Sequence, residues 1–202
     1  ILFKILKEQV GNWQKIIQLA AYNMKSQYSN HYLGVFWNIL QPMMQVGVYY
    51  LIFGLGLRGG GNHLVDGVPF IVHLISGLFP WLFISQSINS GANAIQSNLE
   101  LVTKMKFPSS VLLSISFTNT LFNLCFMTMI LFVISVVNGY VAIWKYFIFL
   151  YFIFAAFPAI FGISLLMSSL VIVVRDTRNL LQNILRLGFF MTPIFWSLNS
   201  AQ

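Results

Sequence analysis

Charged side chains are scarce in this sequence. Only 7% of its 202 residues are Asp, Glu, Lys or Arg, whereas 58% are apolar. A soluble domain carries about a quarter charged residues, so the composition excludes an ordinary soluble fold. Long stretches hold no charge at all, and about 20 apolar residues in a helix cross a bilayer core of roughly 30 Å. The sequence therefore predicts an all-α membrane protein.

The residue types that carry most enzyme chemistry are also few. The three histidines lack metal-ligand spacing, and a single cysteine, Cys125, excludes an internal disulfide or a cysteine-based metal cage. No two carboxylates are placed for acid–base catalysis, because each lies in a different connecting or terminal segment: Glu8, Asp66, Glu100 and Asp176. We therefore predict neither a catalytic site nor a metal site in this chain.

Ion-coupled transport has little support for the same reason. Such transporters hold ionisable residues within their membrane spans, where protons or sodium ions need ligands. The charge-free runs of this chain carry none by definition, and Arg186 directly precedes the last of them, Leu187 to Trp196. Energy for any uphill transport is thus expected to come from another subunit.

Apolar runs define five expected membrane spans, at about residues 33–55, 70–94, 110–137, 146–174 and 183–197 of a transmembrane domain covering 28–202. Residues 1–27 are expected to form an amphipathic helix in the membrane interface, because apolar residues from Phe3 to Ala20 recur at helical steps opposite Lys4, Glu8 and Lys15. A soluble packing helix or a calmodulin-type target would share this pattern. The chain starts at Ile1 and stops just after a span, so we expect a piece of a longer protein.

The distribution of basic residues predicts the orientation. A cytoplasmic N-terminus places nine Lys and Arg residues inside and only Arg58 and Lys145 outside. It also places two charged segments, 95–108 and 175–182, on the cytoplasmic face. The eleven basic residues behind the net charge of +7 are scattered along the chain, which membrane topology explains. Nucleic acid is therefore not an expected partner.

Polar residues share one face of the second span. Gln86, Asn89, Asn93 and Gln96 follow one another at three- and four-residue steps. Hydrogen bonding between helices explains such a face, and so does a hydrophilic wall along which a sugar-rich substrate moves. The sequence leaves both interpretations open.

Four segments in a fixed order carry a family resemblance: 28–42 with Leu33-Gly34 and Trp37, 69–70 with 77–81, 98–108, and Arg175-Asp176 with 192–196. Together they resemble the ABC-2 type polysaccharide export permeases, and among these the permeases that translocate teichoic acid. The resemblance implies six membrane helices, of which five lie in this chain, and a homodimer in the bacterial plasma membrane. It also implies two cytoplasmic ATPase subunits that bind ATP and magnesium, and a lipid-linked polymer flipped to the outer side.

The resemblance assigns roles to two groups of residues. The expected contacts with the ATPase are Glu100, Lys104, Lys106, Arg175, Asp176 and Arg178. The expected substrate pathway comprises aromatic residues of the first and fifth spans, where the family builds its channel: Phe36, Trp37, Tyr49, Tyr50, Phe190, Phe195 and Trp196. The polar face of the second span adds Gln86, Asn89 and Asn93 as a candidate wall of this pathway. Solvated loop charges and aromatic residues at the headgroup level would explain the same residues without these roles.

Other polymers and other functions remain open on the sequence. The same architecture serves permeases for O-antigen, for capsule, and for small molecules or drugs. A membrane scaffold that transports nothing is a further alternative, distinguished by the absence of an ATPase partner.

Overall fold

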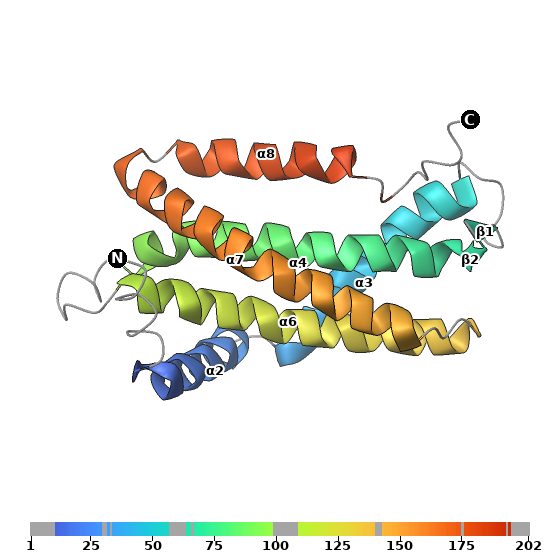
Figure 1. The fold of residues 1–202 in the computed structure, drawn as a ribbon, viewed down its shortest axis with the longest axis horizontal. Helices are drawn as coiled ribbons and strands as arrows, with labels where there is room; N and C mark the ends of the chain where they lie inside the picture. The colour runs from blue at the N-terminus through green and yellow to red at the C-terminus, as the bar shows by residue number, and fades with distance from the viewer. Residues whose placement is uncertain are drawn as a thin grey trace.

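The computed structural model describes residues 11–29, 32, 34–56, 64–65, 67–98, 109–139, 143–174, 176–192 and 194 of the chain. These residues form a helical bundle, which confirms the predicted all-α membrane fold (Figure 1). The described α-helices are α2 (Trp13–Ser29), α3 (Trp37–Tyr49), α4 (Phe70–Ser97), α6 (Ser109–Val137), α7 (Ile143–Val173) and α8 (Thr177–Met191). A 3-10 turn, η1 (Gly34–Phe36), precedes α3, and a π-helix, η2 (Tyr50–Gly56), follows it. A two-residue antiparallel hairpin, β1 (Leu64–Val65) and β2 (Val68–Pro69), leads into α4.

Three helices have the length and composition of membrane spans. They cover 70–97, 111–137 and 144–173, in α4, α6 and α7. These ranges coincide closely with the second, third and fourth predicted spans, 70–94, 110–137 and 146–174. The predicted turn between the third and fourth spans is also present. Helix α6 ends at Val137, and Gly139, two residues later, has a left-handed backbone with φ of 69°.

The predicted first span corresponds to three consecutive helical elements. By itself α3 has 13 residues and is about 20 Å long, which is too short to cross a bilayer. With η1 before it and η2 after it, however, helical backbone continues over 34–56. The location of the predicted span is therefore correct, although its winding changes along the segment.

Helix α8 begins before the predicted fifth span. It starts at Thr177, so most of the predicted cytoplasmic segment 175–182 is helical. Arg178, Gln182 and Arg186 lie on one face of this helix, since they recur every four residues. The helix ends at Met191, because Thr192 takes the extended backbone that a following proline favours, with φ of −78° and ψ of 143°.

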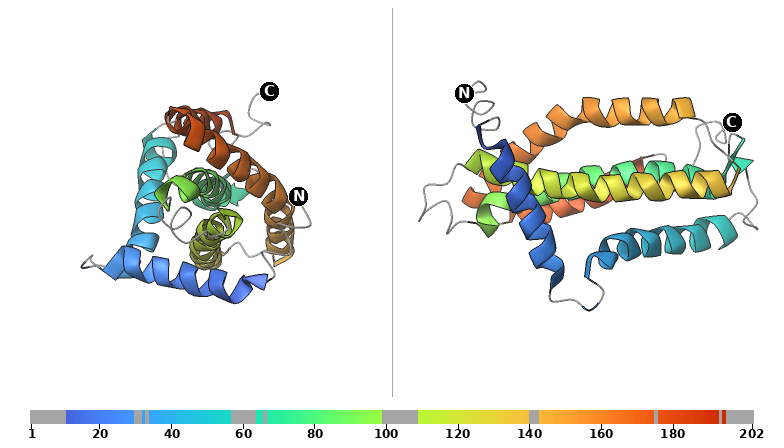
Figure 2. Two further views of the ribbon diagram at one scale, coloured as in Figure 1. Left: turned by 90° about the vertical axis from the view of Figure 1, so that its left-hand side faces the viewer. Right: turned by 90° about the horizontal axis from the view of Figure 1, so that it is seen from below.

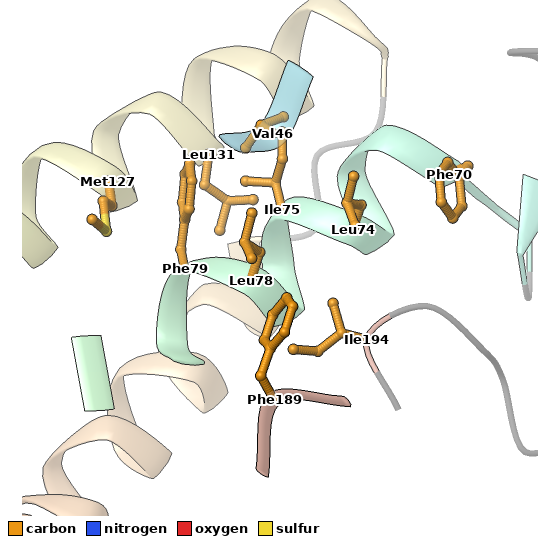
Figure 3. Close-up of a cluster of buried hydrophobic side chains, with 10 residues drawn as sticks. All are labelled: Val46, Phe70, Leu74, Ile75, Leu78, Phe79, Met127, Leu131, Phe189 and Ile194. Atoms are coloured by element: carbon orange, nitrogen blue, oxygen red, sulfur yellow. The ribbon is translucent and has the colours of Figure 1, made fainter. Parts of the chain in front are cut away.

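Helix α4 lies at the centre of the bundle. It packs against both α6 and α7 and also contacts α3 and α8. Viewed end-on, α4 and α6 lie inside the other helices (Figure 2, left). One cluster of buried apolar side chains joins four helices, as Figure 3 shows: Val46, Phe70, Leu74, Ile75, Leu78, Phe79, Met127, Leu131, Phe189 and Ile194.

Helix α2 lies across the long axis of the bundle (Figure 2, right). Its buried Ile16 and Ala20 pack against the start of α6, whereas Trp13 and Ile17 stay exposed. The end of α4, the start of α6 and the α7–α8 connection lie at this same end, opposite the β1–β2 hairpin (Figure 1). This placement is the one expected for an interfacial helix beside the predicted cytoplasmic segments. Residues 1–10 of the predicted helix lie outside the described residues.

Candidate functional site

Helices α3, α4, α6 and α8 surround a cleft of about 400 Å³, here called the wide compartment. Tyr49, Trp81 and Phe189 contribute aromatic surface to it. Its polar lining comes from all four helices: Gln41 and Gln45 of α3, Ser85, Gln86 and Asn89 of α4, Asn123 of α6, and Gln182 and Arg186 of α8. In a bundle of apolar helices, such a surface marks the place where water or a polar ligand enters.

A second cavity of about 330 Å³, here called the amide compartment, lies between α4 and α6. Every described residue that lines it carries an amide or hydroxyl side chain: Gln86, Asn89, Ser90, Asn93, Ser97, Ser116, Asn119, Thr120 and Asn123. Three of these residues, Gln86, Asn89 and Asn123, also line the wide compartment, so the two cavities adjoin. The residues of α4 that line them extend from Leu78 to Ser97, a rise of roughly 28 Å along the helix.

Helical spacing brings these polar groups together. On α4 they recur at 86, 89, 93 and 97, and on α6 at 116, 119, 120 and 123, which places each set on one face. Nearer the β1–β2 hairpin the same interface becomes apolar, with Phe79 of α4 facing Met127 and Leu131 of α6 (Figure 3). The polar face is therefore confined to the half of the α4–α6 interface that lies nearer α2.

Two amide oxygens of the amide compartment lack hydrogen-bond partners. The Asn93 Nδ2 group donates to the backbone oxygen of Asn89 at 2.7 Å and to Asn89 Oδ1 at 3.3 Å. The oxygens Asn93 Oδ1 and Asn119 Oδ1, however, are buried and accept no hydrogen bond from the described part of the chain. A buried acceptor without a donor costs about 1–3 kcal/mol. The lining amides and hydroxyls themselves suit a polar, uncharged guest.

Arg186 brings a charge into the wide compartment. It lies nine residues into α8, a rise of roughly 13 Å from Thr177. The described residues that line the two compartments include no Asp or Glu. Arg186 lies within the predicted fifth span, 183–197, and its exposed side chain lines the open cleft. An ionisable group in a membrane segment is a candidate for a functional site.

Comparison with known proteins identifies the family. Residues 14–202 match the family described as ABC-2 type transporter. The chain belongs to this family. The transporter is 27% identical over 201 residues to the O-antigen export system permease protein RfbA of Myxococcus xanthus, an alignment that covers 100% of this chain and 75% of the relative. Two such permeases of Klebsiella pneumoniae are 28% and 27% identical, each over 90% of this chain and 68% of the relative.

Membership makes the chain a multi-pass membrane component of a transporter and implies an ATPase partner of the ABC type. The matched range includes every helix that lines the cleft. The cleft is therefore part of the transporter domain itself.

In the structure, four of the predicted pathway residues line the cleft. Tyr49, Gln86 and Asn89 line the wide compartment, and Asn93 lines the amide compartment. The ring of Tyr49 lies 5.4 Å from that of Phe189, a buried residue that the sequence reasoning passed over in favour of the exposed Phe190.

The other predicted pathway residues lie elsewhere. Phe36 and Trp37 are exposed at the start of the first span. Tyr50 stacks on Phe70, with ring centroids 6.3 Å apart. Phe190 is exposed and is not among the residues that line the cleft. Phe195 and Trp196 lie outside the described residues. Sequence reasoning missed Gln41, Gln45, Gln182 and Arg186, although two pairs at i, i+4 spacing are a signal for a shared polar face.

Of the predicted ATPase contacts, two can be placed. Asp176 and Arg178 are exposed at the start of α8, at the end of the bundle that carries α2. Glu100, Lys104, Lys106 and Arg175 lie outside the described residues. Contact with an ATPase stays a prediction for all six.

Proposed function

We propose that this chain is the membrane-spanning permease of an ATP-driven exporter, which moves a lipid-linked polysaccharide from the cytoplasmic to the outer side of the membrane. The observation that carries the proposal is the polar cleft, whose lining follows α4 for roughly 28 Å between apolar helices. Its amides and hydroxyls offer the hydrogen bonds that sugar hydroxyls form. The related permeases are named for O-antigen export, which supports a polysaccharide over a drug.

ATP hydrolysis is assigned to separate subunits. In the proposed complex, two copies of the permease assemble with two cytoplasmic ATPases, which bind ATP and magnesium. The exposed Asp176 and Arg178 are candidates for contact with these ATPases. Motion of an ATPase at this point would reach the cleft directly, because Gln182 and Arg186 lie one and two turns further along the same helix.

The relatives favour an O-antigen-type polysaccharide as the substrate, while teichoic acid stays a prediction from the sequence resemblance. The two differ in charge, because a teichoic acid carries phosphate along its whole chain. A polysaccharide with a neutral chain is better matched to the amide compartment, whose nine lining side chains are uncharged.

Reconstitution tests the proposal. The full-length permease and its partner ABC ATPase are placed in proteoliposomes loaded with lipid-linked O-antigen, teichoic acid precursor or a lipophilic drug. We expect ATP-dependent appearance of polysaccharide on the side opposite the ATPase, measured by lectin or antibody accessibility. Transport of the drug alone, or no transport with any ATPase, would refute a polysaccharide exporter.

A further inference from the structure

We infer that the cleft binds one substrate in two parts: Arg186 takes an anionic phosphate group, and the amide compartment takes hydroxyl groups of the sugar joined to it. The inference rests on the proposed function and specifies what part of a lipid-linked sugar each compartment holds.

The phosphate site follows from the charge of the wide compartment. Among the described residues that line either cavity, Arg186 is the one charged side chain. It is exposed, so an anion that enters the open wide compartment can reach its guanidinium group. Gln182 lies one turn earlier on the same face and adds an amide donor. Because the planar guanidinium matches phosphate oxygens with two parallel hydrogen bonds, a phosphate ester is the fitting anion.

The sugar site follows from the lining of the amide compartment, whose amides and hydroxyls can both donate and accept hydrogen bonds. The oxygens of Asn93 and Asn119 are buried beneath this lining without a donor, so a guest reaches them only if these amide groups rotate. An ionised phosphate has no proton to donate, and no cation is found among the described residues that line this compartment. A sugar hydroxyl both donates and accepts, which suits the amides together with the hydroxyls of Ser90 and Ser116.

The two sites adjoin in the order that a lipid-linked sugar requires. Gln86, Asn89 and Asn123 belong to both cavities, so a group held by Arg186 and a group held by Asn93 can be parts of one molecule. In a polyprenyl diphosphate sugar the first sugar is bonded directly to the diphosphate. This chemistry distinguishes the proposed ligand from an ordinary anionic phospholipid, whose phosphate would occupy Arg186 and leave the amide compartment to water.

Equilibrium binding to the intact complex of permease and ATPase in nanodiscs tests the inference. Three probes are compared: a polyprenyl diphosphate bearing one sugar, the same lipid without sugar, and phosphatidylglycerol. We expect Asn93→Leu and Asn119→Leu each to lower affinity for the sugar-bearing lipid about threefold to tenfold and to leave the sugar-free lipid unaffected. Arg186→Gln should weaken both polyprenyl lipids by about tenfold to a hundredfold, with partial recovery in Arg186→Lys.

Matched controls carry the same changes away from the cleft. Asn183→Leu alters an exposed asparagine of α8, and Lys15→Gln removes an exposed charge of α2, and neither residue lines the cavities. Both controls should bind all three probes as the wild type does. Helix content and elution volume confirm that each variant is folded, and the two asparagine variants test the same compartment from different helices.

Three results would overturn the inference. The first is equal weakening of both polyprenyl lipids by the asparagine changes, or no weakening at all. The second is undiminished binding in Arg186→Gln. The third is binding of phosphatidylglycerol as tight as that of the polyprenyl lipids and equally sensitive to Arg186→Gln, which would assign the arginine to ordinary headgroups. If the wild type exports polysaccharide while the variants bind normally, this inference alone fails; absence of export from the wild type refutes the proposed function instead.

Discussion

A close contact between α4 and α7 at Gly91 allows a direct test of the packing. At Gly91 of α4, an added Cβ atom would lie 2.7 Å from Ser164 Cβ and 2.9 Å from Ser164 Oγ of α7. Ser164 is fully buried, and its Oγ donates to the backbone oxygen of Ser87 at 3.4 Å. A Cβ atom cannot rotate away, so Gly91→Ala must push the two helices apart.

The expected loss of stability follows from how much too short this contact would be. Carbon atoms pack at about 3.5–4.0 Å, so the substitution falls short by roughly 1 Å. Such overpacking costs about 1–3 kcal/mol, of which the better helix propensity of alanine offsets about 1 kcal/mol. We therefore expect Gly91→Ala to lower the free energy of unfolding by up to about 2 kcal/mol. Gly162→Ala on α7 is the matched control, because its Cβ meets no atom within 4 Å. It should leave stability unchanged or raise it by up to about 1 kcal/mol.

Equilibrium unfolding in mixed micelles of mild detergent and SDS, followed by circular dichroism, measures these changes. The double variant Gly91→Ala/Ser164→Gly restores the space, so a double-mutant cycle should show a favourable coupling of about 1 kcal/mol or more. If Gly91→Ala is as stable as Gly162→Ala, or if the coupling is absent, the close helix contact does not exist in the folded protein.

Three further outcomes are expected. Phe117→Ala should destabilise the protein by about 3–5 kcal/mol in the same unfolding assay, because its ring lies 4.3 Å from that of Phe157 within a buried cluster. Phe147→Ala, at an exposed site, should cost much less, and equal losses for the two variants would contradict the packing. Ser87→Ala removes a buried 2.8 Å hydrogen bond to Thr120 and should cost about 0.5–2 kcal/mol, and an unchanged unfolding midpoint would show that the bond contributes nothing. A cysteine at 176 should crosslink to the ATPase in at least one nucleotide state, and its failure to do so in every state would count against contact at the start of α8.

The sequence was sufficient to predict α4, α6 and α7, because length and absence of charge define a span independently of its neighbours. The same reasoning misplaced the start of α8. There a charged residue, Arg186, faces a cleft instead of lipid, and only the assembled helices distinguish the two surroundings.

The candidate site was predictable only in part. Regular spacing revealed the polar face of Gln86, Asn89 and Asn93, since all three lie on one helix. The wide compartment instead draws single faces from four helices that are far apart in the sequence, and no local pattern relates Gln45 to Arg186. Aromatic residues led to the opposite error, a pathway residue predicted where none lines the cleft. An exposed ring such as Phe190 suits contact with lipid as well as a substrate pathway, so its residue type cannot distinguish the two.

Burial differs greatly among the three long helices. Within the most apolar window of each, 44% of residues are buried in α4, 28% in α6 and 17% in α7. Most side chains of α7 therefore face away from the described bundle, where they need to be apolar but do not need to fit a neighbouring helix. Random exchange among Leu, Ile and Phe should be tolerated over much of its surface. A complete substitution scan would then show intolerance along one stripe, formed by Ile153, Ile160, Ser164, Ser168 and Val171, so that the record of tolerated residues would itself trace the line where α7 contacts the bundle.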